Sequence, residues 1–195
     1  MGNIAYHNIG DYITNFNLKN YVETGTGVGD CLSHAHQFPF ENYHSIEIFN
    51  ELYLKAVDKF KSNTNCKIHL GNSFDVLPIV LPQLSGPTLF FLDAHFPGSD
   101  FGFNSYDSEK DYNTRLPLEK ELEVIKNNKE TSEDVFIIDD LRIYEDGPFK
   151  TGNWVDRARL GGNGIDFIYK NFESTHNIIK DYGDQGYIIL TPLKK

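Results

Sequence analysis

Long apolar runs, cysteine and basic residues are all scarce in this sequence of 195 residues. No stretch approaches the roughly 18 consecutive apolar residues that indicate a membrane-spanning helix. The first seven residues, MGNIAYH, lack the basic flank and apolar centre of a secretory signal. The two cysteines, Cys31 and Cys66, form neither a disulfide framework nor the spacing of a metal site. We therefore expect one domain over residues 1–195, a cytoplasmic location and no membrane partner.

The shortage of basic residues limits the partners of the protein. Lys and Arg number 18 against 28 Asp and Glu, and the formal net charge is −10. Nonspecific nucleic-acid binding depends on neutralising phosphates with Lys and Arg, and no basic cluster offsets the overall charge. The sequence therefore predicts that the protein does not bind nucleic acid. It also shows no internal repeat or low-complexity tract that would divide the chain.

Three glycines share one turn near the start of the chain, at Gly25, Gly27 and Gly29. The turn follows a short predicted strand, 21–24, that carries Glu23 near its end. Because glycine has no Cβ and tolerates positive φ, such a turn lets a ligand approach the backbone closely. A dinucleotide-binding turn has the spacing G-x-G-x-x-G, and its third glycine would fall at Asp30. The carboxylate beside the turn favours a cationic ligand over a diphosphate.

The following segments alternate between predicted strands and helices. A second strand, 44–48, carries Glu47 near its carboxyl end, about 20 residues past the glycine turn. This spacing suits an acid that accepts hydrogen bonds from both hydroxyls of a ribose. The alternative is a solvated carboxylate at a strand end. A helix over 50–61 and a third strand over 66–70 come next.

Two strongly apolar segments, 88–92 and 135–138, each lead directly into acidic residues. Asp93 and His95 follow the first segment, and Asp139 and Asp140 follow the second. Ligands of open α/β sheets bind outside the carboxyl ends of such strands, so these side chains should share one edge. Carboxylates this close raise one another's pKa unless a cation or a cationic side chain lies among them. A divalent ion is one explanation, and all-oxygen ligands favour Mg²⁺, Ca²⁺ or Mn²⁺ over zinc. The alternatives are a packing role for His95, and helix capping or pairing with Arg142 for the two later acids.

The acid and glycine pattern from Glu23 to Gly29 resembles motif I of the class I methyltransferases that use S-adenosylmethionine (AdoMet). The resemblance implies that the turn holds the methionine half of AdoMet and that Glu23 helps to bind its amino group. It implies a ribose-binding role for Glu47 and places adenine-binding residues at the polar turn after the third strand. The implied cofactor-binding residues are Glu23, Gly25, Thr26, Gly27, Gly29, Glu47, Asn72, Ser73 and Asp93.

The acids after the two apolar segments resemble the metal site of the macrocin and sugar O-methyltransferases. In that group an Asp after the fourth strand and an Asp-Asp pair after the fifth hold Mg²⁺, which implies a metal site of Asp93, Asp139 and Asp140. The group's general base is an Asp two positions after the first of these ligands, where this chain has His95. The resemblance therefore implies catalytic roles for His95 and Asp93. A histidine could accept a proton near neutral pH.

The resemblance covers roughly residues 20–145 and implies an α/β fold. This fold is a doubly wound, seven-stranded, mostly parallel sheet with an antiparallel last strand, the Rossmann-like methyltransferase fold. Two final predicted strands, 177–180 and 187–190, flank a turn rich in Gly and Asp, which fits an antiparallel hairpin. A helix over 164–172 is predicted before them.

Segments outside the motifs also carry predictions. Residues 97–115 are irregular and rich in aromatic side chains, and they form a candidate substrate lid, with a surface excursion as the alternative. Residues 144–162 include the only tryptophan, Trp154, and are expected to close the other side of the pocket. Residues 1–19 form a short leader, so the site is expected to be open or to be closed by a partner subunit in a homo-oligomer.

One acid on a predicted helix has no assigned role. The helix, 117–127, has a buried stripe of Leu118, Leu122 and Ile125, and Glu121 lies beside this stripe. We expect Glu121 to be a solvated flanking residue rather than a ligand.

These patterns together predict an AdoMet-dependent methyltransferase. The predicted reaction is O-methylation of a hydroxyl group on a sugar or another small molecule, assisted by Mg²⁺ or another divalent ion. The alternatives are a nicotinamide-dependent oxidoreductase on a similar sheet and a protein that binds AdoMet without catalysis.

Overall fold

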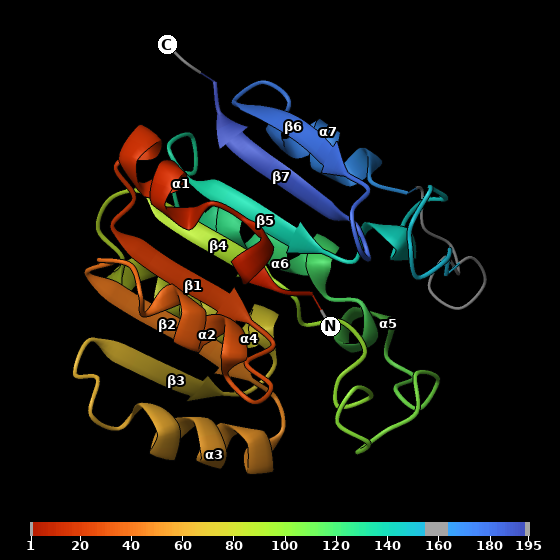
Figure 1. Cartoon of the computed structure of the whole chain (residues 1–195), viewed down its shortest axis with the longest axis horizontal. Helices are drawn as coiled ribbons and strands as arrows, with labels where there is room; N and C mark the ends of the chain where they lie inside the picture. The colour runs from red at the N-terminus through yellow and green to blue at the C-terminus, as the bar shows by residue number, and fades with distance from the viewer. Residues whose placement is uncertain (1, 155–163, 194–195) are drawn as a thin grey trace.

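A seven-stranded sheet forms the centre of the computed structural model, which describes residues 2–154 and 164–193 (Figure 1). The strands lie in the order β3-β2-β1-β4-β5-β7-β6. They are β1 (Asn20–Thr24), β2 (Asn42–Glu47), β3 (Cys66–Leu70), β4 (Thr88–Leu92), β5 (Val135–Asp139), β6 (His176–Asp181) and β7 (Tyr187–Pro192). Neighbouring strands pair in parallel except at β7, which is antiparallel to both β5 and β6. The predicted fold class is therefore confirmed.

The strand order reverses in the middle of the sheet, between β1 and β4. β1 pairs with β2 on one side and with β4 on the other, so that Thr24 lies level with both Ile46 and Leu92. Ligands of open α/β sheets bind outside the carboxyl ends of the strands at such a reversal. The predicted site residues after β1, β4 and β5 therefore meet at one edge of the sheet.

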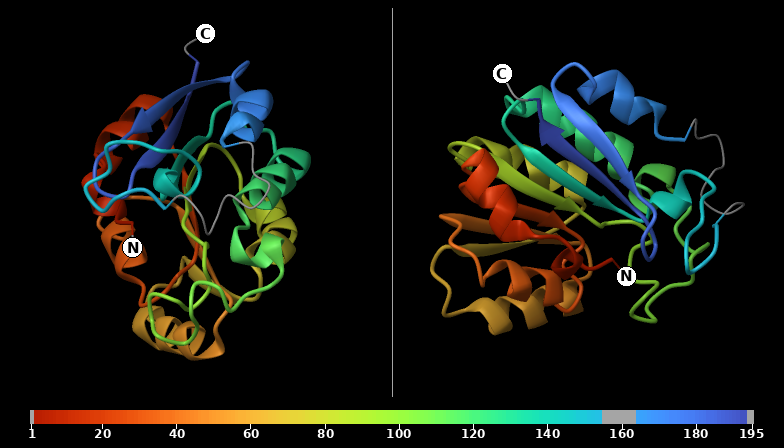
Figure 2. Two further views of the ribbon diagram at one scale, coloured as in Figure 1. Left: turned by 90° about the vertical axis from the view of Figure 1, so that its right-hand side faces the viewer. Right: turned by 45° about the horizontal axis from the view of Figure 1, so that its top comes forward.

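Helices cover both faces of the sheet (Figure 2). One face carries α1 (Ile9–Phe16), α2 (Asp30–Ala35) and α3 (Asn50–Phe60), and the other carries α4 (Ser73–Val80), α6 (Leu118–Asn128) and α7 (Asp166–Phe172). The short elements are α5 (Tyr112–Arg115) and three 3₁₀ helices, η1 (Ile4–Tyr6), η2 (Leu81–Gln83) and η3 (Leu141–Ile143). In the described part of the chain, no helix combines the length and apolar character needed to cross a membrane.

The central strands are buried on both faces. Every residue of β1, β4 and β5 is buried. Phe90 and Phe136 pack toward α4, α6 and α7, whereas Leu89 and Val135 pack toward the opposite layer. Successive side chains of a strand point to opposite faces, so two covered faces require an almost continuous apolar sequence. This burial explains the apolar segments that precede Asp93 and Asp139.

The N-terminal segment and the loop after β4 lie at the carboxyl edge of the parallel strands (Figure 1). Gly2 lies directly against the side chain of Asp139. The backbone N–H of Asn3 donates a hydrogen bond to the hydroxyl of Tyr187 at 3.0 Å. Residues 2 and 3 therefore contact this edge, and the expected closure of the site by a partner subunit stays a prediction.

Candidate active site

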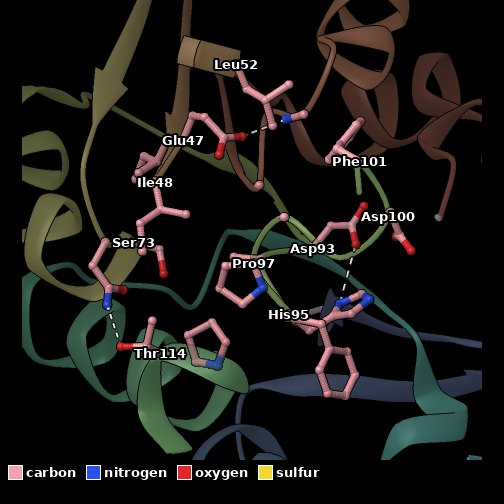
Figure 3. A pocket seen from close by; sticks show the side chains of 18 of the residues that line it. Glu47, Ile48, Leu52, Ser73, Asp93, His95, Pro97, Asp100, Phe101 and Thr114 are labelled. Carbon is pink, nitrogen blue, oxygen red and sulfur yellow. Dashed lines mark hydrogen bonds and ion pairs between the residues drawn. The ribbon is translucent and has the colours of Figure 1, made fainter. Parts of the chain in front are cut away.

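A cleft lies at the carboxyl ends of β1, β2 and β4 (Figure 3). Its walls come from the glycine turn, the end of β2, the start of α4 and the loop after β4. The predicted site residues that line it are Gly25, Gly27, Glu47, Asn72, Ser73, Asp93 and His95.

A second cavity, of about 210 Å³, adjoins the cleft on the side of the N-terminal segment. Gly2, Asn3, Tyr6 and Thr26 are among its lining residues. The cleft and this cavity have three lining residues in common, Gly25, Gly27 and Asp93. The two spaces therefore meet at the glycine turn, and a ligand that occupies both would cross the turn.

Other segments approach two positions of the turn so closely that only glycine fits there. Gly25 and Gly27 have φ values of 82° and 56°. A Cβ at Gly25 would collide with the backbone of Asp93, and a Cβ at Gly27 would lie 2.5 Å from the ring of Phe101. Only glycine adopts these conformations without cost and leaves this space free. Gly29 has a different position, because it precedes α2 and lines neither the cleft nor the second cavity.

Glu47 is held rigidly at the wall of the cleft. The residue is 4% exposed, and its carboxylate accepts hydrogen bonds from the backbone N–H groups of Gly27 and Phe49, both at 2.8 Å. Burial raises the pKa of Glu47, and these N–H donors oppose the rise. Each carboxylate oxygen can accept a further hydrogen bond. The alternative of a solvated strand-end carboxylate is therefore wrong, and Glu47 is placed to bind hydroxyl groups in the cleft.

Glu23 lies beneath the turn rather than in the cleft. It is 1% exposed, and its carboxylate accepts hydrogen bonds from the hydroxyls of Tyr21 and Ser45, both at 2.7 Å. Burial raises the pKa of Glu23 to about 7. Ser45 Oγ also lies 2.5 Å from Thr26 Oγ1, which connects Glu23 to the turn. Because Glu23 lines neither cavity, its direct contact with a ligand stays a prediction.

Asn72 and Ser73 begin α4 and face the cleft. The Asn72 side-chain amide donates a hydrogen bond to Thr114 Oγ1 at 3.0 Å, which ties the start of α4 to α5. Ser73 Oγ is buried and has no hydrogen-bond partner among the described residues. Both residues line the cleft, and their role in binding adenine stays a prediction.

Asp93 and Asp139 form the acidic part of the edge. Burial raises the pKa of Asp93 well above its usual range, and the neighbouring charge of Asp139 raises it further. Burial and the charge of Asp140 raise the pKa of Asp139 to about 6. Both oxygens of Asp139 lack a hydrogen-bond partner within residues 2–154 and 164–193, although the residue is only 2% exposed.

His95 lies between two carboxylates. Its Nε2 atom is 2.8 Å from Asp140 Oδ2, and its Nδ1 atom is 3.5 Å from Asp93 Oδ1. The other oxygen of Asp140 accepts a hydrogen bond from Arg142 Nε at 2.7 Å. Burial lowers the pKa of His95, but the hydrogen bond to Asp140 and the charges of Asp140, Asp139 and Asp100 together outweigh burial, and the net change is a rise. Burial alone would raise the pKa of Asp140, but His95 and Arg142 lower it. Cationic side chains thus neutralise Asp140.

The donor groups at this edge fit a divalent ion. Asp93, His95 and Asp139 each offer one ligand atom, and these atoms lie within 4.8 Å of one another. The unpartnered oxygens of Asp139 are a further indication, because a buried charge without a partner is costly. Asp140 does not belong to this group in the structure. The set of Asp93, Asp139 and Asp140 therefore stays a prediction.

The solvated environment predicted for Glu121 is wrong. The residue is 1% exposed and lines a small cavity together with His95 and Asp139. Burial raises its pKa to about 7. The hydroxyls of Thr24 and Ser73 lie beside it, yet none of the three groups has a well-aligned hydrogen bond within the described residues. A sequence signal existed, because positions 118, 121, 122 and 125 share one helical face.

The predicted lid, 97–115, packs against the glycine turn and the start of α3. The ring of Phe101 packs against Gly27 at the junction of the two cavities. Phe103 stacks on Phe49 with ring centroids 5.3 Å apart, and Phe49 lies at the start of α3. Figure 3 shows Phe101 and Asp100 beside Asp93. The loop therefore covers the space over the glycine turn.

Trp154 packs against the same loop, on the side away from the glycine turn. Its ring lies 4.7 Å from that of Tyr106 and 5.0 Å from that of Phe96, and the guanidinium of Arg142 lies 4.9 Å from its ring centroid. Trp154 does not line the cleft, so it supports the loop rather than closing the pocket. The end of the predicted region, 155–162, lies outside the described residues.

Several solved structures share this arrangement of strands and helices. One is a Staphylococcus aureus protein described as a caffeoyl-CoA O-methyltransferase. The match covers 99% of this chain and 85% of that protein, with a TM-score of 0.64 and 15% identity. The chain has the class I methyltransferase fold.

Other methyltransferases have the same fold. The methyltransferase PaMTH1 of Podospora anserina, bound to S-adenosylhomocysteine, matches 93% of this chain and 75% of its own, with a TM-score of 0.58 and 12% identity. An rRNA methylase of Streptococcus thermophilus matches 100% and 99% of the two chains, with a TM-score of 0.55 and 10% identity. No protein-family model and no curated protein sequence matches the chain. At these identities the shared property is the fold, because one fold supports many activities.

Proposed function

We propose that the protein is an AdoMet-dependent methyltransferase that acts on a hydroxyl group of a small molecule, such as a sugar, with the assistance of a divalent ion. The observation that supports this most strongly is the pair of cavities that meet at the glycine turn. A nucleoside suits the cleft beside Glu47, and an amino acid suits the cavity beside Thr26.

The cleft offers a suitable partner for each part of the nucleoside. The Glu47 carboxylate has free acceptor capacity for two ribose hydroxyls. Asn72 and Ser73 lie where an adenine ring would sit beyond that ribose. Asp93 lines both cavities, so it would lie near the centre of the bound cofactor. Any effect of Glu23 on the amino group is indirect, through Ser45 and Thr26.

The residues of the edge would position and activate the acceptor. When bound, AdoMet supplies the methyl group, and a divalent ion beside the acceptor lowers the pKa of its hydroxyl. Asp93 and Asp139 would hold the ion, and Phe101 and Pro97 would exclude water from the cleft. Much of the rate would come from holding two reactants in the correct orientation. Both nitrogens of His95 face carboxylates, so its role as the base stays a prediction.

Other functions on this fold are less well supported. A nicotinamide cofactor would place a diphosphate beside the acidic turn. An RNA substrate would meet a chain with a formal net charge of −10. Binding of AdoMet without catalysis needs the same cavities, and only a reaction assay distinguishes it.

Calorimetry with S-adenosylhomocysteine (AdoHcy), the product of methyl transfer, tests the proposal. We expect the wild type to bind AdoHcy, and Glu47→Gln to bind it about 10- to 100-fold more weakly, because hydrogen bonds to a charged group contribute about 1.5–3 kcal/mol. Glu51→Gln is the matched control, since Glu51 is an exposed acid at the start of α3. NAD should give no heat.

Methyl transfer from AdoMet to a panel of sugars and other hydroxyl compounds completes the test. Transfer to a hydroxyl supports the proposal. Binding of AdoHcy without transfer to any acceptor would favour the noncatalytic alternative, and binding of NAD in place of AdoHcy would refute the assignment.

A further inference from the structure

Three side chains from two neighbouring strand ends approach one point at the edge of the sheet. They are Asp93 and His95 after β4 and Asp139 at the end of β5, and their ligand atoms lie within 4.8 Å of one another. Figure 3 shows Asp93 and His95 facing each other across the cleft floor. Ligand atoms bound to one ion at about 2.0–2.2 Å are at most about 4.4 Å apart. Only a small adjustment would therefore bring these atoms around an ion.

The carboxylate of Asp139 independently indicates a bound cation. It is 2% exposed, and neither oxygen has a well-aligned hydrogen bond within the described ranges, although the carboxyl group of Asp93 lies beside it. Leaving an ionised carboxylate buried and unpaired is costly, and coordination to a metal removes that cost. Among the described residues, Arg142 and His95 Nε2 are both paired with Asp140, and the charge of His95 only partly offsets the rise in the pKa of Asp139.

The carboxylate of Asp140 does not belong to this group of ligand atoms, although Asp140 follows Asp139 directly. Asp140 has a φ of 61°, and its oxygens are not among the ligand atoms that converge. One oxygen of Asp140 accepts a hydrogen bond from Arg142, and the other contacts His95 Nε2 at 2.8 Å. This contact fixes the His95 ring and leaves Nδ1, which lies 3.5 Å from Asp93 Oδ1, as the nitrogen available to an ion. A carboxylate that orients a metal-binding imidazole in this way is common in metal sites.

We propose that the divalent ion is bound by His95 Nδ1 and by the carboxylates of Asp93 and Asp139, that Asp140 is a positioning residue, and that the site prefers Mn²⁺ and similar transition ions to Mg²⁺. The preference follows from the ligand set, because imidazole suits transition ions, whereas carboxylates and water suit Mg²⁺. A histidine bound in this way has no nitrogen left to accept a proton. The inference therefore excludes His95 as the base of the proposed reaction, and it rests on that function only for the use of the ion.

Metal binding can be measured without cofactor or substrate. The EDTA-treated full chain is titrated with Mn²⁺ alone, and the free ion is followed by electron paramagnetic resonance, with Mg²⁺ as competitor. We expect one Mn²⁺ to bind about tenfold or more tightly than Mg²⁺. Pulsed measurements on the bound Mn²⁺ should show coupling to a ¹⁴N nucleus, which only a nitrogen ligand gives.

Three variants separate the roles of the residues. His95→Gln should remove the ¹⁴N coupling and weaken Mn²⁺ binding at least about tenfold. His95→Asp should bind Mn²⁺ without showing the ¹⁴N coupling. It should also reduce the preference for Mn²⁺ over Mg²⁺, because all ligand atoms are then oxygens. Asp140→Asn should keep the coupling but bind Mn²⁺ about 10- to 100-fold more weakly, as expected for a residue that orients a ligand. His34→Gln, on α2, is the matched histidine control and should match the wild type.

Several results would overturn the inference. They are the absence of ¹⁴N coupling in the wild type, its persistence in His95→Gln, equal affinity for Mg²⁺ and Mn²⁺, or no detectable metal binding. Circular dichroism on each variant confirms folding, and the wild-type measurements stand even if a variant fails to fold. AdoHcy binding is measured separately, so loss of the proposed function and loss of this metal assignment give different results.

Discussion

Glu121→Gln should stabilise the protein at alkaline pH and have little effect at acidic pH. Glu121 is 1% exposed, and burial raises its pKa from 4.5 to about 7. Because the folded state then binds this proton more tightly than the unfolded chain, the free energy of unfolding falls as pH rises from about 4.5 to about 7. Glutamine has the shape of the protonated acid and carries no charge at either pH.

The size of the effect follows from the two pKa values. Their difference of about 2.5 corresponds to about 3 kcal/mol above pH 7, which falls to less than about 0.5 kcal/mol near pH 4.5. For a chain of this length, 1 kcal/mol changes Tm by about 2–4 °C. The variant should therefore melt about 6–12 °C above the wild type at pH 8.5, with nearly equal Tm values near pH 4.5.

Differential scanning calorimetry between pH 4.5 and 8.5, with EDTA present, measures this difference. Subtracting the wild type at each pH removes the contributions of other titrating groups. Glu119→Gln on the same helix is the control, because Glu119 is exposed and its substitution should not change Tm with pH. A Glu121→Gln variant that is less stable at pH 8.5, or whose advantage does not change with pH, would refute the reasoning.

The remaining predictions concern the edge and the turn. Asp139→Asn should abolish methyl transfer and leave AdoHcy affinity in calorimetry nearly unchanged, and substantial turnover by this variant would remove Asp139 from the mechanism. Excess EDTA should stop methyl transfer, whereas full activity would remove the metal. Gly102→Ala should lose about 1–2 kcal/mol of stability, since φ is 74° there, and Gly27→Ala, with a φ of 56°, should lose at least as much because its Cβ would also collide with the ring of Phe101. Only Gly27→Ala should also weaken AdoHcy binding, because a Cβ at Gly102 would meet no neighbour, and equal affinities would contradict the assigned role of the turn.

The parts of the fold that are set by burial could be predicted from the sequence. A strand covered on both faces must be apolar throughout, so β4 and β5 were identifiable, and Asp93 and Asp139 followed at their ends. α4 was not predicted, because its sequence contains Pro78 and an exposed Ile79 and so lacks a clear polar face. An amphipathic pattern identifies a helix more readily than a sequence with apolar residues on several sides does.

The details of the site depend on contacts that no local pattern contains. The oxygens of Asp140 pair with His95 and Arg142 and do not join Asp93 and Asp139, which the Asp-Asp spacing alone does not reveal. Glu121 is buried because α6 packs on α4 and the end of β1, and its charge misled the sequence prediction. Phe101 was expected in a lid, but its contact with Gly27 depends on how the whole loop folds back.

A crystal structure of the protein with AdoHcy tests the central claim most directly. The account predicts the ribose hydroxyls at the Glu47 carboxylate, the adenine beside Asn72 and the amino-acid portion in the cavity beside Thr26. Density for AdoHcy at another place, or folded protein crystallised at saturating AdoHcy with both cavities empty, would contradict the account.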